Sequence, residues 1–300
     1  MKRYKFYTCD VFTNVRFGGN QLAVLPEAQG LSERLMLQIA REFNYSETTF
    51  VFPPREENSH EVRIFTPGGV VPFAGHPNIG TAFILATTGH LGKIDGSTVV
   101  TFEEKAGVVP VTVEKRPGGA LFCELRAPEK LSVGRTAPSD LLADILNIAD
   151  QDILTSTHPP QVASVGLPFL IAELRDLPTL AQAQVKPERL KLLTSLGEPG
   201  LIHLYTRCTG QFDLRARMFA PLLGVPEDPA TGSANSALAG LLCHFDNQKT
   251  SLSRWTIAQG IEMGRASTIH ARAEKENGEV KNTWVGGACV LVGEGWITTD

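Results

Sequence analysis

The octapeptide EDPATGSA, at Glu227–Ala234, stands at the start of a long apolar segment and has a partner earlier in the chain. The pattern R-x-F-x-P-x-x-x-V-P precedes it at Arg217–Pro226, and the same pattern occurs at Arg63–Pro72. The two copies are offset by 154 residues (Arg63 to Arg217), which is close to half of the 300-residue chain. Repetition at such a spacing indicates a duplicated structural unit. We therefore predict two similar halves that face each other across a cleft, with the paired loops meeting there.

Each copy of the pattern leads into a glycine-containing loop and then into an apolar segment of helical length. The first loop, FAGHP, occupies Phe73–Pro77. We predict a helix from Pro77 to about Thr88, because proline is favoured at the first position of a helix. Apolar side chains surround this helix and its counterpart after Gly232 on every side, which is typical of a buried helix. One buried central helix is therefore expected in each half.

The order of the predicted elements indicates the fold class and the domain boundary. Strand-like segments outnumber helical ones without regular alternation, which favours an α+β fold over a doubly wound parallel sheet. The turn at Arg116–Gly119 predicts a boundary between an N-terminal domain of residues 1–117 and a C-terminal domain of residues 118–291. A C-terminal strand around residues 292–300 is a candidate to return to the first domain.

Composition excludes several classes of protein. The hydrophobic share of 42% and the charged share of 20% are ordinary for a globular protein. A net charge of −4, without a cluster of Lys and Arg, argues against nucleic-acid binding. No apolar run approaches the length of a membrane span, and the N-terminus lacks the apolar core of a signal peptide. We expect a soluble, cytoplasmic protein with no membrane partner.

The residues that commonly hold metals and cofactors are scattered. The five cysteines form no C-x-x-C pair, and the seven histidines show neither H-x-x-x-H nor H-E-x-x-H spacing. The chain also lacks a phosphate-binding G-x-x-x-x-G-K-[ST] loop and a G-x-S-x-G nucleophile motif. The sequence therefore predicts no metal and no cofactor.

Glu47 is the first candidate for chemistry. It lies among Ser46, Thr48 and Thr49 at the start of a predicted strand, with apolar sequence immediately after. A carboxyl group that is partly withdrawn from water has a raised pKa and can exchange protons near neutral pH. The alternative is a solvated glutamate at the entrance of a strand.

His76 and Asp228 are the candidates in the two paired loops. A histidine at the N-terminus of a buried helix is favoured in its neutral form by the helix dipole, although His76 could instead be a core or capping residue. Asp228 could cap the following helix or contact a substrate. At the offset of 154 residues, Asp228 corresponds to Ala74 and Ala230 to His76. The loops thus differ in chemistry, which predicts a site whose two faces perform different tasks.

Gly232 and Ser233 open the second central helix. A glycine there lets a ligand approach the N–H groups of the first turn, and those groups together with the helix dipole attract an anion. We predict a small carboxylate-bearing substrate, because no lysine accompanies the loop as it does in phosphate sites.

Together these segments resemble the phenazine-biosynthesis PhzF-like proteins. The matching motifs run in order along the whole chain, and they are FGGNQLAV at 17–24, SET at 46–48, AGHP at 74–77, EDPATGSA at 227–234 and QG-x-x-x-GR at 259–265. The resemblance implies the diaminopimelate-epimerase-like fold, with two pseudo-symmetric domains, each a curled, mostly antiparallel sheet around a central helix. It also implies a cofactor-independent isomerase that acts by proton transfer on a substrate bound between the domains, and that forms a homodimer.

The resemblance assigns roles to particular residues. Glu47 matches the general acid/base of the family, and the supporting polar groups are His76, Asp228 and Ser233. Gly75 and Gly232 match backbone contacts to substrate, and Asn20 lies in the first motif, which is assigned to substrate binding.

Two features of the loops separate this chain from some relatives. The loops contain no cysteine, so racemisation by two thiols is out of keeping with the sequence. Asn78 replaces the threonine that many members of the family carry after G-H-P, which puts the identity of the substrate in doubt. The alternatives are a non-catalytic binding protein of the same fold, or an epimerase or racemase that does not use cysteines.

Overall fold

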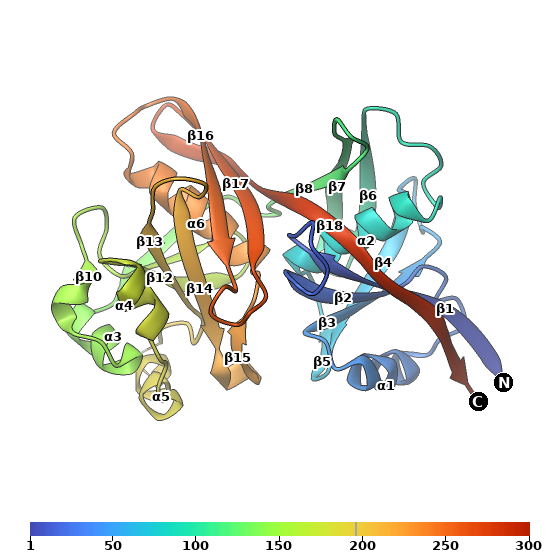
Figure 1. The fold of residues 1–300 in the computed structure, drawn as a ribbon, viewed down its shortest axis with the longest axis horizontal. Helices are drawn as coiled ribbons and strands as arrows, with labels where there is room; N and C mark the ends of the chain where they lie inside the picture. The colour runs from blue at the N-terminus through green and yellow to red at the C-terminus, as the bar shows by residue number, and fades with distance from the viewer. Residues whose placement is uncertain (196) are drawn as a thin grey trace. The chain divides into compact units, whose positions relative to one another are not determined.

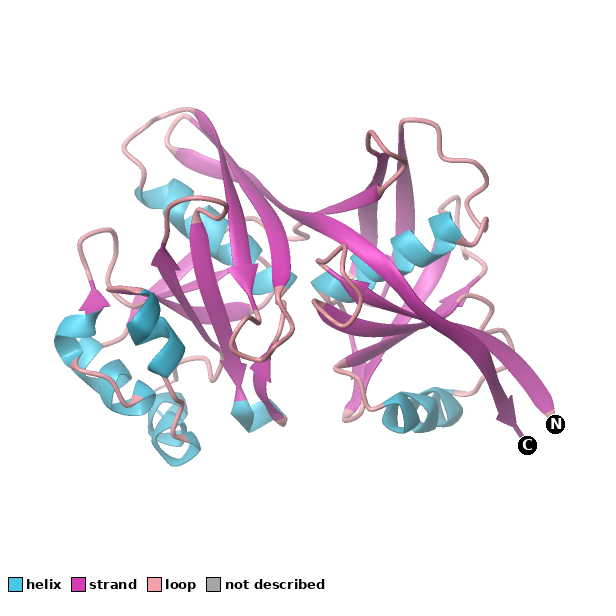
Figure 2. Cartoon of the chain, viewed as in Figure 1, coloured by secondary structure: helices cyan, strands magenta, loops and turns pink. Residues whose placement is uncertain are grey.

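The structure is a computed structural model that describes residues 1–195 and 197–300. Helix makes up 22% and strand 43%, so the predicted mixture with an excess of strand is confirmed. The chain divides into two compact units (Figures 1 and 2). Unit 1 contains residues 1–126 and 286–300, and unit 2 contains residues 127–285.

The boundary between the units lies beyond the turn that we predicted as a linker. Strands β7 (Gly107–Lys115) and β8 (Leu121–Arg126) pair antiparallel, with Lys115 opposite Leu121. Residues 116–119 therefore form the turn of a hairpin inside unit 1, and β8 does not open the second half. Proline and glycine mark hairpin turns and linkers alike, so sequence could not distinguish the two.

Unit 1 is a sheet built around a helix. Strand β2 pairs antiparallel with β1 and parallel with β3, β4 pairs antiparallel with β3 and parallel with β6, and β6 pairs antiparallel with β7. The bounds of these strands are Lys2–Val11 (β1), Asn20–Leu25 (β2), Glu47–Phe52 (β3), His60–Thr66 (β4) and Ser97–Glu104 (β6). Helix α1 (Glu33–Phe43) begins after Ser32, whose hydroxyl accepts a hydrogen bond from the backbone N–H of Leu35 at 3.3 Å.

The central helix of unit 1 is α2 (Gly75–Thr87), and it is buried from Gly75 to Leu85. It contacts strands β1, β2, β3, β7 and β8, and Figure 1 labels it within unit 1. A Cβ atom at Gly80 would lie only 2.5 Å from the side chain of Leu22, so the strands approach the helix closely there. The helix begins two residues before the predicted Pro77, because Ala74 takes the N-cap position.

Unit 2 repeats the same order of pairings. Strand β12 (Pro168–Leu174) pairs parallel with β13 (Ile202–Arg207), and β13 pairs antiparallel with β14 (Leu214–Ala220). Strand β14 pairs parallel with β16 (Ser251–Gln259), which pairs antiparallel with β17 (Ser267–Glu276). This sequence of parallel and antiparallel pairs matches β2, β3, β4, β6 and β7 of unit 1.

The central helix of unit 2 is α6 (Gly232–Phe245), which contacts β11, β12, β16 and β17. The remaining elements are β5 (Gly69–Val71), β9 (Ser132–Thr136), α3 (Ser139–Leu146), the 3-10 helix η1 (Asp150–Asp152), β10 (Ile153–Leu154), β11 (Gln161–Ser164), α4 (Leu177–Gln182), α5 (Pro187–Ser195), the 3-10 helix η2 (Pro221–Leu223), β15 (Val225–Asp228) and β18 (Glu279–Thr299).

The offset between the two copies changes inside one hairpin. Ile64 lies opposite Val71 in the β4–β5 pair, and Met218 lies opposite Asp228 in the β14–β15 pair. The offset of 154 residues (Ile64 to Met218) thus becomes 157 residues (Val71 to Asp228), because η2 and a register shift lengthen the second hairpin.

The change of offset overturns part of the predicted correspondence. The two helices begin at Gly75 and Gly232, so His76 corresponds to Ser233 rather than to Ala230. Asp228 likewise does not correspond to Ala74, because Ala74 is the N-cap residue and Asp228 ends a strand.

Strand β18 leads the chain from unit 2 back into unit 1. Its residues from Gly286 onward belong to unit 1, six residues before the predicted return at 292. There it pairs antiparallel with the whole of β1, from Val11 opposite Cys289 to Lys2 opposite Thr299.

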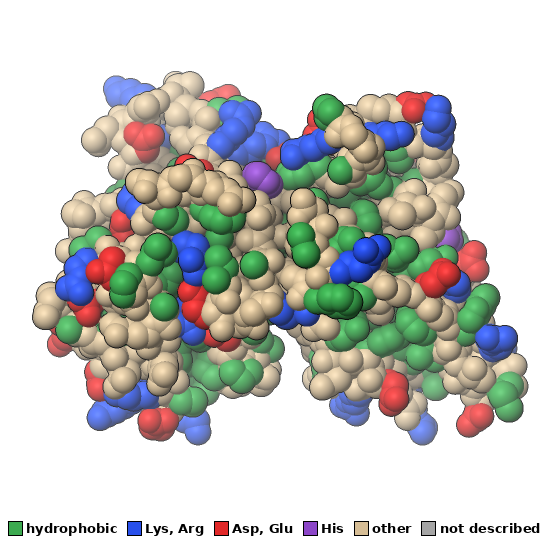
Figure 3. Space-filling view, viewed as in Figure 1, with side chains coloured by type: hydrophobic (Ala, Val, Ile, Leu, Met, Phe, Trp, Pro, Cys, Tyr) green, Lys and Arg blue, Asp and Glu red, His purple; other side chains and the backbone are tan. Residues whose placement is uncertain are grey.

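The surface and the helices add two observations. On the face shown in Figure 3, Lys and Arg side chains are interspersed with Asp and Glu in both units. Within residues 1–195 and 197–300, no helix combines the length and the apolar character that a membrane crossing requires.

Candidate active site

Unit 1 brings together Glu47, His76 and Asn20. Glu47 is the first residue of β3, and His76 is the second residue of α2. The Nε2 atom of His76 lies 3.5 Å from Oε2 of Glu47. The Nδ2 atom of Asn20, at the start of β2, lies 3.4 Å from Nδ1 of His76. Three of the predicted site residues therefore form one chain of contacts.

The hydrogen bonds of Asn20 assign the protonation of the histidine ring. The hydroxyl of Ser46 donates to Oδ1 of Asn20 at 3.1 Å, which leaves the amide N–H groups directed at His76. Because an amide nitrogen only donates, Nδ1 of His76 is the acceptor and the proton of the neutral ring lies on Nε2. This tautomer presents an N–H group to the carboxylate of Glu47.

Glu47 is a buried acid poised near neutral pH. Its side chain is 18% exposed, and Oε2 has no hydrogen-bond partner within the described residues. Burial raises the pKa of Glu47 to about 7, although the neighbouring hydroxyl of Ser46 partly opposes this effect. A carboxyl group with such a pKa can both accept and donate a proton under physiological conditions.

The start of α2 supplies backbone donors beside this acid. Gly75 is the first helical residue, and the N-cap residue Ala74 forms no side-chain capping bond. The N–H groups of a first helical turn have no partner within the helix, and they favour an anion. The predicted contribution of Gly75 to substrate binding is consistent with this position.

Unit 2 holds Asp228 in a network of buried hydrogen bonds. The hydroxyl of Thr231 donates to the carboxylate of Asp228. The side-chain amide of Gln259 donates to the backbone carbonyl of Asp228 at 2.8 Å and to Oγ1 of Thr231 at 3.1 Å. Its Oε1 accepts from Nδ2 of Asn235 at 2.7 Å and from the N–H of Thr231 at 3.3 Å. Gln259 thereby ties the loop to strand β16 and fixes the position of Asp228.

The helix start of unit 2 repeats the arrangement of unit 1. Thr231 is the N-cap residue of α6 and forms no side-chain capping bond, since its hydroxyl is directed at Asp228. Gly232 and the half-buried Ser233 are the first two helical residues. The predicted residues of unit 2 therefore lie on one loop and one helix start.

Sequence reasoning missed the residues that hold these groups in place. Gln259 was visible only as part of a family motif, because its partners Thr231 and Asn235 lie 28 and 24 residues away. Asn78 and Asn235 occupy the same position in α2 and α6, which the offset of 157 residues would have shown. The assumed constant offset of 154 residues concealed it.

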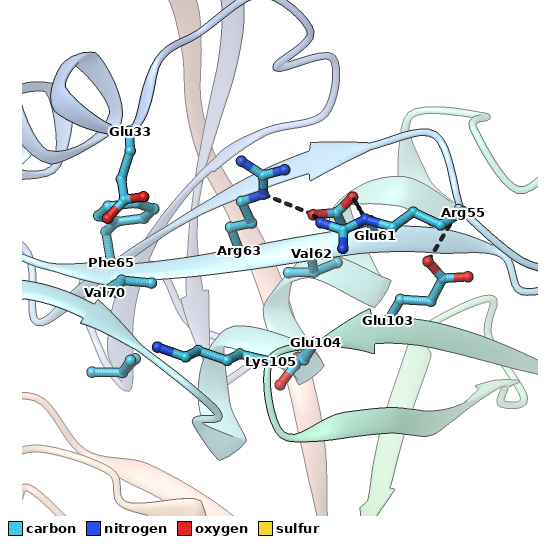
Figure 4. Close-up of a pocket in the computed structure, with 11 residues that line it drawn as sticks. Glu33, Arg55, Glu61, Val62, Arg63, Phe65, Val70, Glu103, Glu104 and Lys105 are labelled. Carbon is cyan, nitrogen blue, oxygen red and sulfur yellow. Dashed lines mark hydrogen bonds and ion pairs between the residues drawn. The ribbon is translucent and has the colours of Figure 1, made fainter.

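A cavity of about 440 Å³ lies in unit 1, and none of the predicted site residues lines it (Figure 4). Arg55 and Arg63 converge on Glu61, with nitrogen-to-oxygen distances of 2.5 and 2.7 Å. The lining as a whole contains four glutamates against three cationic side chains, so the cavity is not an evident anion site. The lining residues are Glu33, Arg55, Glu61, Val62, Arg63, Phe65, Val70, Val71, Glu103, Glu104 and Lys105.

Among the residues that the structure describes, no group of three or more His, Cys, Asp or Glu side chains is placed to hold a metal ion. The chemistry that the two clusters offer is that of proton transfer and hydrogen bonding.

The solved structures most similar to this fold include proteins of two kinds. A phenazine biosynthesis protein of the PhzF family from Bacillus anthracis superposes with a TM-score of 0.88 at 23% identity, with 100% of each chain covered. A hydroxyproline epimerase from Agrobacterium vitis superposes with a TM-score of 0.64 at 15% identity, covering 99% of this chain and 91% of the other. At these identities the likeness concerns the fold alone.

Sequence comparison identifies relatives that are named as isomerases. An uncharacterized isomerase of Mesorhizobium japonicum is 33% identical over 98% of this chain and 99% of its own. The trans-2,3-dihydro-3-hydroxyanthranilate isomerase of Pseudomonas aeruginosa is 31% identical over 97% of this chain and 98% of its own. The family model described as phenazine biosynthesis-like protein matches residues 9–295. The predicted resemblance is confirmed: the chain belongs to the phenazine biosynthesis-like, or PhzC-PhzF, family.

Proposed function

We propose that this protein is a cofactor-independent isomerase in which Glu47 carries a proton between two carbon atoms of a small carboxylic acid. The enzyme class is isomerase, the class that several of its curated relatives are named for. The observation that carries the mechanism is the buried Glu47, with its pKa near 7, against the Nε2 atom of His76.

The reaction balances without an external reagent. Ionised Glu47 takes a proton from a carbon beside an electron-withdrawing group, and the electron pair of the broken C–H bond delocalises into the conjugated system of the substrate. Glu47 then returns the proton to a different carbon, which regenerates the carboxylate. The Nε2–H group of His76 steadies the ionised form of Glu47 at each end of the cycle.

The remaining predicted residues suit the polar groups of such a substrate. In unit 1 the N–H groups at Gly75 suit a substrate carboxylate. In unit 2 the N–H groups at Gly232, with Ser233 as a further donor, suit the same kind of group. The carboxylate of Asp228 suits an amino or hydroxyl group. The named substrate of the Pseudomonas aeruginosa relative, a dihydro-hydroxyanthranilate, carries all three kinds of group.

The first test is the Glu47→Gln variant, which keeps the shape of the side chain and removes its acid–base chemistry. With trans-2,3-dihydro-3-hydroxyanthranilate as the probe substrate, the variant should retain less than about a tenth of wild-type turnover, since general acid–base catalysis contributes about 10²-fold or more. Glu42→Gln is the matched control, because Glu42 is exposed on α1. Turnover above a tenth in the Glu47 variant would remove Glu47 from this role.

The second test follows the proton itself. Turnover in heavy water should place deuterium at the carbon that receives the proton, because an acid that holds a proton between two steps exchanges it with solvent. Dialysis against a chelator should leave the rate unchanged. If chelation stopped the reaction and a divalent metal restored it, the proposed mechanism would be wrong.

A further inference from the structure

The two central helices share an asparagine in the first turn that bonds back to the N-cap residue. In α2 the Nδ2 atom of Asn78 donates to the carbonyl of Ala74 at 3.0 Å. In α6 the Nδ2 atom of Asn235 donates to the carbonyl of Thr231 at 2.9 Å. Both side chains are fully buried. Each bond braces the short segment that presents the first N–H groups of the helix, including His76 in one unit and Ser233 in the other.

In both units the side-chain oxygen Oδ1 of this asparagine accepts no hydrogen bond from a described residue. The Oδ1 atoms of Asn78 and Asn235 are buried and have no hydrogen-bond partner within the described residues. A buried acceptor without a donor is destabilising, so its repetition at equivalent positions requires an explanation.

A buried titratable group lies against each asparagine. Glu104, at the end of β6, interacts with Asn78, and both of its carboxyl oxygens are shielded from solvent without a partner in the described part of the chain. His203, on β13, interacts with Asn235, and its side chain is fully buried with neither ring nitrogen bonded to a described residue. Each pair therefore consists of an acceptor without a donor and a group that can carry a proton.

We propose that Glu104 is a positioning residue that stays protonated in the folded protein and donates its O–H to Oδ1 of Asn78. His203 plays the same part in unit 2 through a ring N–H directed at Oδ1 of Asn235. The inference rests on the proposed function in one respect, namely that the braced helix starts are the substrate-binding elements.

Burial favours the neutral form of both groups. Burial raises the pKa of Glu104 to about 8, with the interaction with Asn78 opposing it in part. Burial also lowers the pKa of His203 to about 4, and the nearby Asn235 opposes this effect in part. At pH 7 Glu104 thus retains its O–H and His203 is a neutral ring with one N–H, which are the donors that the two amides lack.

The charged groups around Glu104 balance one another, so they do not favour its ionised form. Glu104 lines the 440 Å³ cavity (Figure 4). The nearby Glu61 is neutralised by Arg55 and Arg63. The charged groups that face the cavity from α1, from the segment after β3, from β4 and from the end of β6 are Glu33, Arg55, Glu61, Arg63, Glu103 and Lys105. The three cations among them are matched by three carboxylates other than Glu104.

The direction of the pH effect follows from the raised pKa. In the unfolded chain Glu104 ionises near 4.5, whereas in the folded protein it ionises near 8. Its contribution to stability is therefore complete below pH 4.5 and is lost as the pH rises through 8. Above that pH the carboxylate can no longer donate to Asn78, and the start of α2 loosens.

The experiment detects the buried proton by infrared spectroscopy of the full chain. The Glu47→Gln background removes the other carboxyl group of raised pKa, so the carbonyl band of a protonated carboxylic acid at pH 7 reports on Glu104. We expect this band to titrate away near pH 8 and to vanish when Glu104→Gln is added. Adding Glu103→Gln instead should leave the band in place, because Glu103 is held ionised by the N–H groups of Arg55 and Glu56. If no such band exists, or if it survives Glu104→Gln, the proposal is wrong.

Hydrogen exchange then tests the positioning role. Glutamine at position 104 can still donate to Asn78, whereas leucine of similar size cannot. We expect the amides of residues 75–79 to exchange about tenfold faster in Glu104→Leu than in Glu104→Gln at pH 7. In the wild type the protection of these amides, relative to the intrinsic base-catalysed rate, should fall above pH 8, whereas Glu104→Gln should keep its protection. Equal exchange in the two variants would contradict the positioning role. If Glu104→Leu does not fold, Glu104→Gln still tests the role, because a loss of protection above pH 8 like that of the wild type would contradict it.

These readouts separate the inference from the proposed function. The infrared band and the exchange rates require no turnover, so they stand if the protein does not isomerise the probe substrate. If it does, the alkaline decline of kcat/KM near pH 8 should also be absent in Glu104→Gln.

Discussion

Glu47 combines two properties that seldom occur together in one side chain. It begins a strand, so its backbone is fixed by the register in which Leu22 of β2 lies beside it. Its carboxyl group nevertheless has no bonded cation, since its neighbour is the ring of His76 at 3.5 Å. A carboxylate beside arginine would have a depressed pKa and would be a poor proton donor at pH 7. No such partner is present among the described residues, so no cation offsets the effect of burial on the pKa of Glu47.

The pH dependence of turnover is the first prediction at this scale. If ionised Glu47 takes the proton, kcat/KM should rise with pH through an apparent pKa of about 7, before the alkaline decline expected from Glu104 near pH 8. The measurement is a pH–rate profile on the probe substrate from pH 5 to 9. A profile that is flat across pH 7 would contradict the assignment.

His76 should shift that profile. Its Nε2–H group stabilises the carboxylate of Glu47, so His76→Leu should move the rising limb of kcat/KM to higher pH by about one unit or less. The expected shift of the profile is small because Nε2 of His76 lies as far as 3.5 Å from Oε2 of Glu47. A limb that moved to lower pH would show that the ring disfavours the ionised form instead.

At the scale of elements, the two arginines of the repeated motif have diverged. Arg217 is 8% exposed, forms two hydrogen bonds with Glu227, and donates to the carbonyls of Leu180, Ala181 and Ala183 at the end of α4. Arg63 is 38% exposed and shares Glu61 with a second arginine. The arginine of the duplicated motif therefore binds the carbonyl groups at the end of a helix in unit 2, whereas in unit 1 it forms a half-exposed ion pair.

The matched substitutions Arg217→Met and Arg63→Met should separate these roles. The first leaves buried carbonyls and Glu227 without their donor and should cost about 3 kcal/mol or more of unfolding free energy. The second should cost about 1 kcal/mol or less, because Glu61 keeps another partner. Urea unfolding of both variants measures the difference, and equal losses would contradict it.

The elements also show what sequence could reveal. Both central helices could be predicted because apolar residues on every side leave a helix no exposed face. The start of α2 could not, because proline is tolerated throughout the first turn and the N-cap geometry of Ala74 decides. Glu47 and His76 could be recognised from their local setting. Glu104 and His203 could not, since their significance depends on the buried asparagines that tertiary packing brings against them.

At the scale of the whole molecule, groups that are buried in neutral form set the pH range of stability. Glu47 and Glu104 have raised pKa values, so their stabilisation is lost as the pH rises from 4.5 through about 7 and 8. The pKa values of His60, His158 and His203 are lowered by burial, so their stabilisation is lost as the pH falls below 6.5. These opposing losses favour greatest stability in mildly acidic solution.

Glu47→Gln should accordingly stabilise the protein in alkaline solution. At pH 8 the wild type bears the cost of a buried carboxylate, and we expect the variant to gain about 1–3 kcal/mol, with a much smaller gain at pH 5. Thermal unfolding at the two pH values measures this, with Glu42→Gln as the control. A gain of equal size at both pH values would point to a packing effect rather than to ionisation.

The path of β18 has a consequence for how the protein is made. Unit 2 is one continuous segment, whereas unit 1 needs residues 286–300 to cover the edge of β1. During translation the segment that begins second is therefore the first to be complete. The amino-terminal unit waits on the ribosome with an open strand edge, which is the feature that promotes pairing with other chains. A chain that stopped before Cys289 would be released in that exposed state.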